Sequence, residues 1–212
     1  MITIKRFTVN PLEENSYLLS DESGECLIVD AGFYFPGEKE EITAFIAEAG
    51  LTPVGLINTH CHFDHLMGVE YLRKKYGIPF SCPSGEEYWL SRASKQAAMF
   101  GFRMEDVAPA DSLLTEGEPV RFGNSLLEVI WVPGHSAGHV VFYSGEGKFL
   151  LSGDVLFRGS IGRSDLHGGN YAQLMRSIGE KLLILPPETT VWPGHGSETT
   201  IGTEKVYNPF LV

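Results

Sequence analysis

Short apolar runs that end in a turn bearing histidine or aspartate are the strongest constraint on how this chain can fold. VGLIN runs into THCHFDH, EVIWV into PGH, KFLL into SGD, and TVW into PGH. Such runs, bounded by Gly, Pro or Asp, are typical of strands rather than helices. Because rigid scaffolds present functional groups on loops at strand ends, we expect the chemistry of this protein at the ends of its strands.

Helical segments separate the groups of predicted strands. The runs ITIKRFTV, SYLLS and ECLIVDAG predict a small antiparallel sheet, and the apolar spacing in PGEKEEITAFIAEAG predicts a helix. Further helices are predicted over residues 68–76, 84–100 and 171–183, the second with Ser84 as N-cap and Glu87 completing a capping box. This order favours an α/β (α+β) architecture, with two sheets packed together and helices outside, over a doubly wound parallel sheet.

Length and composition predict one globular domain. The chain has 212 residues, of which 43% are hydrophobic and 20% charged, which is enough to bury a sizeable core. No linker or strong internal repeat divides the sequence, although two similar halves remain an alternative. We therefore predict a single domain over residues 1–212.

The charge and the cysteine content of the chain limit the binding partners and the cellular compartment that we expect for it. The net charge of −11, from 27 acidic and 16 basic side chains, opposes binding to nucleic acid. The N-terminus lacks the apolar core of a secretory signal, and no apolar run approaches the roughly 18 residues of a membrane span. Three cysteines at irregular spacing argue against a disulfide framework. We expect a cytoplasmic protein that binds neither membranes nor nucleic acid.

Imidazole and carboxylate side chains gather in the predicted turns, which indicates a metal site. These ligands suit zinc, and also iron or manganese, whereas calcium and magnesium prefer oxygen alone. Five histidines and two aspartates are too many for one tetrahedral ion, so we expect two divalent metal ions. The candidate ligands are His60, His62, Asp64, His65, His135, Asp154 and His195.

A pair of cations predicts hydrolysis of an acyl compound. Water held by two cations loses a proton near neutral pH, which provides a nucleophile without serine or cysteine. The same ions can polarise a substrate carbonyl and stabilise the oxyanion that forms.

The turn motifs resemble those of the metallo-β-lactamase superfamily. THCHFDH, VPGHSAGH, LSGDVLF and WPGHG match its successive motifs in order and spacing, and they cover nearly the whole chain. FRGSIGRSDL and the ending TTIGTEKVYNPFL resemble the short bacterial members of the glyoxalase II (hydroxyacylglutathione hydrolase) group. The resemblance implies one metallo-β-lactamase-fold domain, an αββα sandwich of two mixed β-sheets flanked by helices, with the metals at one edge.

The resemblance also implies a role for each candidate ligand. His60, His62 and His135 would bind the first metal, and Asp64, His65 and His195 the second, with Asp154 bridging the two. Asp64 and Asp154 would be catalytic, together with a metal-bridging hydroxide that attacks the thioester carbonyl. An aspartate at position 154, where one class of true β-lactamases has cysteine, favours the thioesterase side of the superfamily.

Three further side chains are candidates to support the metal-binding imidazoles. Asp30 and Asp165 could accept the second ring N–H of a ligand histidine. Asp30 could equally cap a turn at a strand end. His139 could support the His135 loop, although a structural hydrogen bond is the favoured alternative.

Arg163 has two interpretations of equal weight. It could bind a substrate carboxylate through a bidentate contact, or it could fix its own loop by pairing with Asp165. His167, in the same region, is expected to be a surface residue without a ligand role.

Two features of the segment around the first histidines also have alternative interpretations. Cys61 lies inside the motif and could be a nucleophile, but its position between two ligand histidines favours packing. The stretch from Trp89 to Phe102 could be a lid whose apolar contacts include Tyr88 and Met99, or a helix packed on the core.

The leading hypothesis is a metal-dependent thioesterase resembling hydroxyacylglutathione hydrolase, acting on a small-molecule thioester. Long enzymes of that group grip glutathione with a C-terminal helical region, which we expect to be missing here, so a different thioester is an alternative. A relative with the same motifs, an iron-dependent persulfide dioxygenase, would use His60, His135 and Asp154. Lactamase or lactonase, nuclease and non-catalytic scaffold functions are the remaining alternatives.

Overall fold

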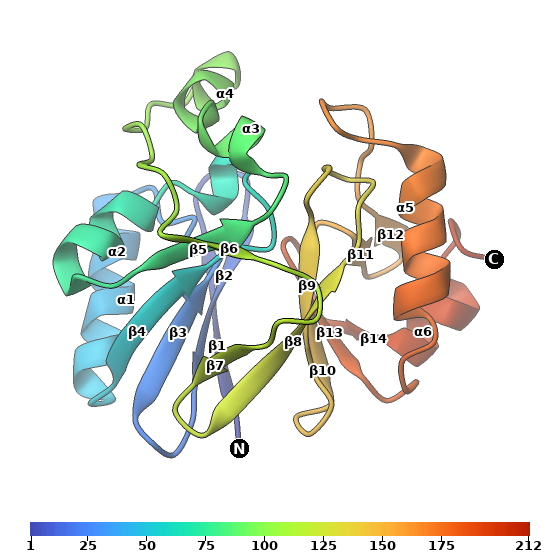
Figure 1. Cartoon of the computed structure of the whole chain (residues 1–212), viewed down its shortest axis with the longest axis horizontal. Helices are drawn as coiled ribbons and strands as arrows, with labels where there is room; N and C mark the ends of the chain where they lie inside the picture. The colour runs from blue at the N-terminus through green and yellow to red at the C-terminus, as the bar shows by residue number, and fades with distance from the viewer. The chain divides into compact units, whose positions relative to one another are not determined.

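The computed structural model describes residues 1–212, which divide into two compact units. Unit 1 comprises residues 1–114 and 121–125, and unit 2 comprises residues 115–120 and 126–212. Figure 1 shows the helices and strands of each. The prediction of a single domain stays a prediction.

Unit 1 contains a mixed sheet with the strand order β1-β2-β3-β4-β5-β6. The first three strands are antiparallel, as their sequence predicts, and β3 to β6 run parallel. The strands are β1 (Thr3–Val9), β2 (Glu14–Ser20), β3 (Glu25–Val29), β4 (Thr52–Ile57), β5 (Phe80–Pro83) and β6 (Ser112–Leu114).

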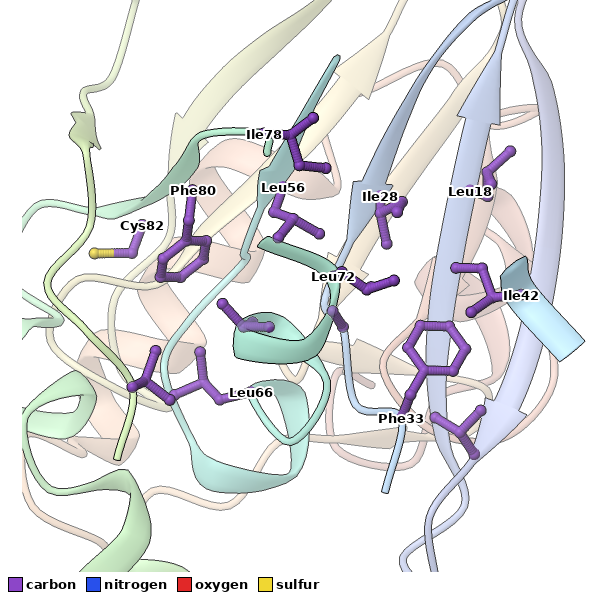
Figure 2. Close-up of a cluster of buried hydrophobic side chains, with 14 of the residues drawn as sticks. Leu18, Ile28, Phe33, Ile42, Leu56, Leu66, Leu72, Ile78, Phe80 and Cys82 are labelled. Atoms are coloured by element: carbon purple, nitrogen blue, oxygen red, sulfur yellow. The ribbon is translucent and has the colours of Figure 1, made fainter. Parts of the chain in front are cut away.

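Two helices, α1 (Pro36–Glu48) and α2 (Val69–Tyr76), pack on this sheet. Helix α1 begins where the sequence predicts. Pro36 occupies its first turn, and the Glu38 carboxylate accepts hydrogen bonds from the backbone N–H groups of Tyr34 and Phe35. Figure 2 shows Ile42 of α1 and Leu72 of α2 among the buried side chains of the strands. This core fixes β4, whose end begins the THCHFDH loop.

The helix predicted over residues 84–100 is instead two short helices, α3 (Glu87–Leu90) and α4 (Ala93–Met99). Ser84 is not an N-cap, because residues 83–86 form a turn in which the N–H of Glu86 donates to the carbonyl of Pro83. Gly85 has a φ of 93°, which no helix accommodates. The Glu87 carboxylate accepts from the N–H of Gly85 inside this turn. The turn therefore overrides the apparent capping box.

Unit 2 contains a second mixed sheet, in which β14, β13, β10, β9 and β8 are neighbours in that order. Pairing is parallel between β10 and β13 and antiparallel in the other pairs. The strands are β8 (Ser125–Trp131), β9 (Val140–Ser144), β10 (Phe149–Gly153), β13 (Thr190–Pro193) and β14 (Thr199–Thr200). Strand β7 (Val120–Phe122) precedes β8 where the chain divides between the units.

A hairpin and two helical segments complete unit 2. The hairpin pairs β11 (Leu156–Phe157) with β12 (Ser160–Ile161). The predicted helix after residue 171 is α5 (Tyr171–Ser177), which continues as a π-helix, η2 (Ile178–Leu182). The last helix, α6 (Ile201–Tyr207), was not predicted. None of the helices in either unit has the length and apolar character that crossing a bilayer requires.

Candidate metal-binding residues

The histidines of the THCHFDH loop lie close together in unit 1. The loop leaves β4 and closes with a single 3₁₀ turn, η1 (Phe63–His65). The ring centroids of His60 and His62 are 4.7 Å apart, and those of His60 and His65 are 4.2 Å apart. All three side chains are buried. One short loop thus presents three imidazoles in a small volume, as its sequence predicts.

Buried amide side chains hold the backbone of this loop. The Asn58 side-chain N–H₂ donates to the carbonyls of His60 and His65, at 3.1 and 2.9 Å. From the β1–β2 turn, Asn10 donates to the carbonyl of Asp64 at 3.1 Å. Such bonds satisfy carbonyls that no strand or helix could reach. The protein's own hydrogen bonds therefore hold the conformation of this loop.

The buried carboxylate of Asp30, at the end of β3, contacts the loop at two places. It accepts hydrogen bonds from the N–H and the hydroxyl of Thr59, at 2.7 and 2.8 Å. Its Oδ2 also lies 3.2 Å from His65 Nδ1. The residue has a φ of 52°, an uncommon conformation for a side chain other than glycine. Asp30 is thus placed where a carboxylate can orient His65.

A second carboxylate, from Glu14, faces the same ring. Its Oε1 lies 3.6 Å from His65 Nδ1, and its Oε2 accepts a hydrogen bond from the Ser16 hydroxyl at 2.8 Å. Burial raises the pKa of Glu14 well above its usual value. Glu14, Asp30 and His65 present ligand-type atoms within 4.8 Å of one another. Glu14 was not among the predicted site residues, because nothing near it in sequence marks it as a neighbour of His65.

The candidate ligands of unit 2 come from the ends of three strands that run in the same direction. Strand β8 leads to His135, β10 to Asp154, and β13 to His195. His135 Nε2 lies 3.8 Å from Asp154 Oδ2, and His195 Nε2 lies 3.6 Å from the same oxygen. Three residues that are far apart in sequence are therefore brought to one edge of this sheet.

A backbone carbonyl and a histidine side chain position two of the unit 2 ligands. The carbonyl of Arg163 lies 2.8 Å from His135 Nδ1, and the N–H of Asp154 donates to His139 Nε2 at 3.1 Å. A Cβ at Gly162 would lie 1.9 Å from the carbonyl oxygen of Asp154, so only glycine fits there. His139 thus makes a structural hydrogen bond, the alternative that was favoured for it.

Arg163 pairs with Asp165 in a bidentate contact, with N–O distances of 2.7 and 2.8 Å. Both side chains are exposed, and the hydrogen bond from Arg163 lowers the pKa of Asp165 to about 2. Of the two alternatives for Arg163, the structure contains the ion pair. At His135 Nδ1, the neighbouring oxygen is the Arg163 carbonyl rather than the Asp165 carboxylate.

The C-terminal helix anchors the loop between Asp154 and Arg163. The buried carboxylate of Glu204 accepts hydrogen bonds from Thr199, Asn208 and the N–H of Gly159, at 2.5, 2.8 and 2.8 Å. Asn208 also donates to the carbonyl of Ser160 at 3.0 Å. Glu204 and Asn208 belong to the ending TTIGTEKVYNPFL, whose contacts with the β11–β12 turn the sequence alone did not indicate.

The donor atoms of unit 2 have a spacing that suits a metal ion. Metal–nitrogen and metal–oxygen bonds of 2.0–2.2 Å in a tetrahedral site separate neighbouring ligand atoms by about 3.4 Å. The separations of 3.6 and 3.8 Å from Asp154 to the two imidazoles are close to this value and too long for hydrogen bonds. In unit 1, His65 Nε2 lies 3.9 Å from Asp64 Oδ2. The donors of each unit therefore fit divalent cations.

The remaining sequence candidates lie in different surroundings. Cys61 is fully buried, and burial raises the pKa of its thiol well above the usual value. His167 is exposed, as expected. In the Trp89–Phe102 segment, the ring of Phe102 contacts Phe63 at 5.6 Å, whereas Met99 is 84% exposed. The segment thus combines core packing with exposed apolar side chains.

Sequence comparison identifies relatives of this chain. The chain matches the family model of the metallo-beta-lactamase superfamily over residues 9–195. It is similar to the probable metallo-hydrolase YqgX of Bacillus subtilis, with 43% identity over 209 residues that cover 98% of this chain and 96% of that protein. It is also similar to the hydroxyacylglutathione hydrolase GloC of Haemophilus influenzae, with 34% identity over 212 residues that cover 99% and 98%.

Solved structures share the fold. BLEG-1, a B3 metallo-beta-lactamase, has a TM-score of 0.91 and 37% identity, covering 99% of this chain and 100% of its own. TTHA1623 in a di-iron-bound form has a TM-score of 0.89 and 38% identity, covering 98% and 100%. ETHE1 from Myxococcus xanthus has a TM-score of 0.79 and 25% identity, covering 98% and 83%. The predicted fold class, two mixed sheets with helices, is confirmed.

Proposed function

Because the chain belongs to the metallo-β-lactamase superfamily, we propose that it is a metal-dependent hydrolase whose substrate is a small-molecule thioester. Support for the thioester comes from the likeness to a hydroxyacylglutathione hydrolase over nearly the full length of both chains. The aspartate at position 154 is a further argument, because cysteine there would be typical of a class of lactamases.

All seven predicted ligands bind metal ions in this proposal. His60, His62, Asp64 and His65 come from unit 1, and His135, Asp154 and His195 from unit 2. Two divalent ions are the proposed cofactor, with zinc the first candidate and iron or manganese the alternatives, since one relative binds two irons. When bound, such ions lower the pKa of a water molecule and polarise a carbonyl oxygen.

The protein's own groups then orient the ligands and keep their charges balanced. Asp30 faces the Nδ1 edge of His65 at 3.2 Å, and the Arg163 carbonyl lies 2.8 Å from His135 Nδ1, which leaves the Nε2 atom of each ring for a cation. Asp64 and Asp154 are the proposed catalytic carboxylates, because their negative charge balances the cations and their oxygens can accept a proton from water.

The contact of one Asp154 oxygen with two imidazole nitrogens, at 3.6 and 3.8 Å, is the observation that carries the metal-dependent part of the proposal. A histidine pair that served only to pack would have no reason to converge on one oxygen of a partly buried carboxylate. The spacing suits ligands of a shared ion better than hydrogen-bonded neighbours.

A substrate panel run with metal analysis on the same sample tests the proposal. Thioesters of glutathione and coenzyme A, a lactam, a phosphodiester and a persulfide would be assayed with and without a chelator. We expect thioester hydrolysis that the chelator abolishes and added metal restores. Oxygen uptake with a persulfide and one iron per chain would instead identify a dioxygenase, the activity named as the alternative. Lactam turnover alone would identify a lactamase.

A further inference from the structure

Arg92 is an exposed cation without a carboxylate partner in an acidic protein. It lies between α3 and α4, and its guanidinium carbon stands 4.2 Å from the ring centre of Tyr88. Its Nη1 donates to the Ser91 hydroxyl at 3.1 Å and to the Tyr88 carbonyl at 3.4 Å. Arg163 and Arg73, by contrast, are neutralised by aspartate. Arg92 therefore keeps its charge available for an anion.

Ring contacts link Arg92 to a candidate metal ligand. The ring of Trp89 stands edge-on to His62, with centroids 5.0 Å apart and an interplanar angle of 71°. Tyr88 contacts Trp89 at 5.2 Å and 85°. Arg92 covers the other ring in this series, that of Tyr88. We refer to Trp89, Tyr88 and Arg92 as the aromatic ledge, which begins at His62 and ends at a cation.

Two buried side chains fix the ledge to the THCHFDH loop. On the N-terminal side, the Glu86 carboxylate accepts a hydrogen bond from the N–H of Cys61 at 3.0 Å. On the C-terminal side, the Gln96 side-chain oxygen accepts from the N–H of Phe63 at 3.0 Å. These anchors flank Arg92 in sequence and end on either side of His62. The position of Arg92 relative to His62 is therefore set by the fold of unit 1.

We propose that Arg92, held on Tyr88, binds an anionic group on the thiol portion of the substrate, at the end of the ledge away from His62. The inference rests on the proposed thioester hydrolase function. A guanidinium offers paired N–H donors that match a carboxylate or a phosphate. Its stacking on a tyrosine ring orients the fork and reduces the entropy lost on binding.

Carboxylate and phosphate are the two sources of this anion in common thiols. Glutathione carries carboxylates, and coenzyme A carries phosphates. The ledge offers its aromatic faces to the uncharged atoms that join the anion to the sulfur. Binding of a substrate anion was one of the two interpretations of Arg163. In this proposal Arg92 has that role, because Arg163 is already paired with Asp165.

Steady-state kinetics with three acetyl thioesters test the inference, because the acyl group is then constant and only the thiol differs. The thiols are glutathione, coenzyme A and the uncharged N-acetylcysteamine. For Arg92→Gln we expect KM to rise about tenfold for at least one anionic thioester, the loss of one charged hydrogen-bond contact. We expect kcat within about twofold, and the N-acetylcysteamine ester unaffected. The ester that responds identifies carboxylate or phosphate as the ligand.

Three further variants separate binding from general disruption. Arg103→Gln removes the same charge from an exposed arginine that makes no ring contact, and we expect no change in KM. Tyr88→Phe keeps the ring and should retain the wild-type KM, whereas Tyr88→Leu should raise it as Arg92→Gln does. Circular dichroism and metal content would show that each variant is folded and loaded.

Equal KM values for Arg92→Gln and the wild type with both anionic thioesters would overturn the inference. If the wild type hydrolysed none of the three esters, the thioesterase proposal itself would fail. The ledge would then be tested by the dissociation constants of S-methylglutathione and dephosphorylated and intact coenzyme A. A larger dissociation constant for Arg92→Gln than for the wild type would support anion binding by Arg92, and unchanged dissociation constants would refute it.

Discussion

The two sets of candidate ligands are supported in different ways. In unit 1, the histidines are nearly contiguous in sequence, and side chains hold them: two carboxylates face His65, and buried amides hold the loop backbone. In unit 2, the ligands come from three separate strand ends; the main-chain carbonyl of Arg163 faces His135, and the ring of His139 accepts from the backbone N–H of Asp154. The unit 1 ligands lie on a loop that needs hydrogen bonds from side chains. The unit 2 ligands lie at a sheet edge where strand pairing already fixes the backbone.

This contrast explains which supporting residues each unit needs. A loop that leaves β4 has no ladder of hydrogen bonds, so its carbonyls and N–H groups must find side chains such as Asn58, Glu86 and Gln96. The strand ends of unit 2 are fixed by sheet pairing, and only the connection from Asp154 to Arg163 requires an external anchor. We therefore expect replacement of supporting carboxylate and amide side chains to reduce metal binding by unit 1 most. Replacement of the residue that anchors the β11–β12 hairpin should destabilise unit 2 most.

Replacing Asp154 should have the largest effect. The variant Asp154→Ala removes the oxygen on which two imidazoles converge, and the expected loss in metal affinity exceeds the roughly 10–100-fold that follows loss of an outer partner. Thioester turnover should fall with it. Mass spectrometry of the metal content, with Asp165→Ala as an exposed control, checks this, and normal metal content in Asp154→Ala would refute the assignment.

Replacing Asp30 tests the support of unit 1. In Asp30→Asn, the negative charge beside His65 Nδ1 is lost and one acceptor for Thr59 becomes a donor. We expect metal affinity to fall about 10–100-fold. A competition titration with a chromophoric chelator measures it. Asp165→Asn is the matched change in unit 2 and should leave the affinity as it is, since a carbonyl orients His135; equal losses in both variants would erase the contrast.

Replacing Glu204 tests the hairpin anchor of unit 2. Glu204→Leu leaves the buried donors of Asn208 and Thr199 without their acceptor, at a cost of about 1–3 kcal/mol each, and also removes the acceptor of the Gly159 N–H. Glu204→Gln keeps an acceptor oxygen and can donate to Thr199, so it should lie closer to the wild type. Urea unfolding gives the stabilities, and amide exchange over residues 155–163 should accelerate only in the leucine variant. Similar losses in both variants would argue against the anchor.

At low pH, the stability of the protein should depend more on Asp21 in unit 1 than on Asp165 in unit 2. Hydrogen bonds from Ser23, followed by Ser125 and Asn124, hold the pKa of Asp21 well below its usual value. The folded state then binds fewer protons than the unfolded state, so the stability that Asp21 contributes is present above its unfolded pKa of about 3.9 and is lost as the pH falls below it.

Urea unfolding between pH 5 and pH 2.5 measures this dependence. Asp21→Asn should flatten the loss of stability below about pH 4. The pKa of Asp165 is also lowered, to about 2, but its pair with Arg163 is exposed and screened by solvent, so Asp165→Asn should change the acid stability less than Asp21→Asn does. A larger acid effect from Asp165 than from Asp21 would contradict this order.

Replacing Cys61 should have the smallest effect on turnover. Its thiol is fully buried and its pKa is raised, so it is neither exposed to substrate nor available as thiolate. We expect Cys61→Ala to keep kcat within about twofold once the protein is folded and loaded. Loss of turnover with metal content intact would restore the nucleophile interpretation.

The sequence predicted the positions of the candidate ligands better than their support. THCHFDH is informative because its residues are neighbours in the chain, and the strand-end turns at 135, 154 and 195 share one pattern. Glu14, Gln96 and Glu204 reach their partners across long stretches of sequence, and nothing in the pattern links them. Such contacts depend on the tertiary fold and could not be read from local spacing.

Local features explain why the predicted helix start at Ser84 is wrong and why the sequence left two partners open for Arg163. Ser84 and Glu87 have the spacing of a capping box, but the positive φ of Gly85 makes a turn there and delays the helix. Arg163 could have served a substrate or Asp165, and residues two apart in a loop pair readily, so only the structure shows which partner it has. Arg92 had no motif to mark it.

Metal content of matched variants, one in each unit, tests the central claim most directly. The claim is that the donors of each unit bind divalent metal ions in a thioesterase. We predict about two ions per chain in the wild type, with metal and thioester turnover both reduced in His60→Ala and in His195→Ala. Wild-type metal content and turnover in either variant would contradict the claim, as would a single iron with oxygen uptake in place of hydrolysis.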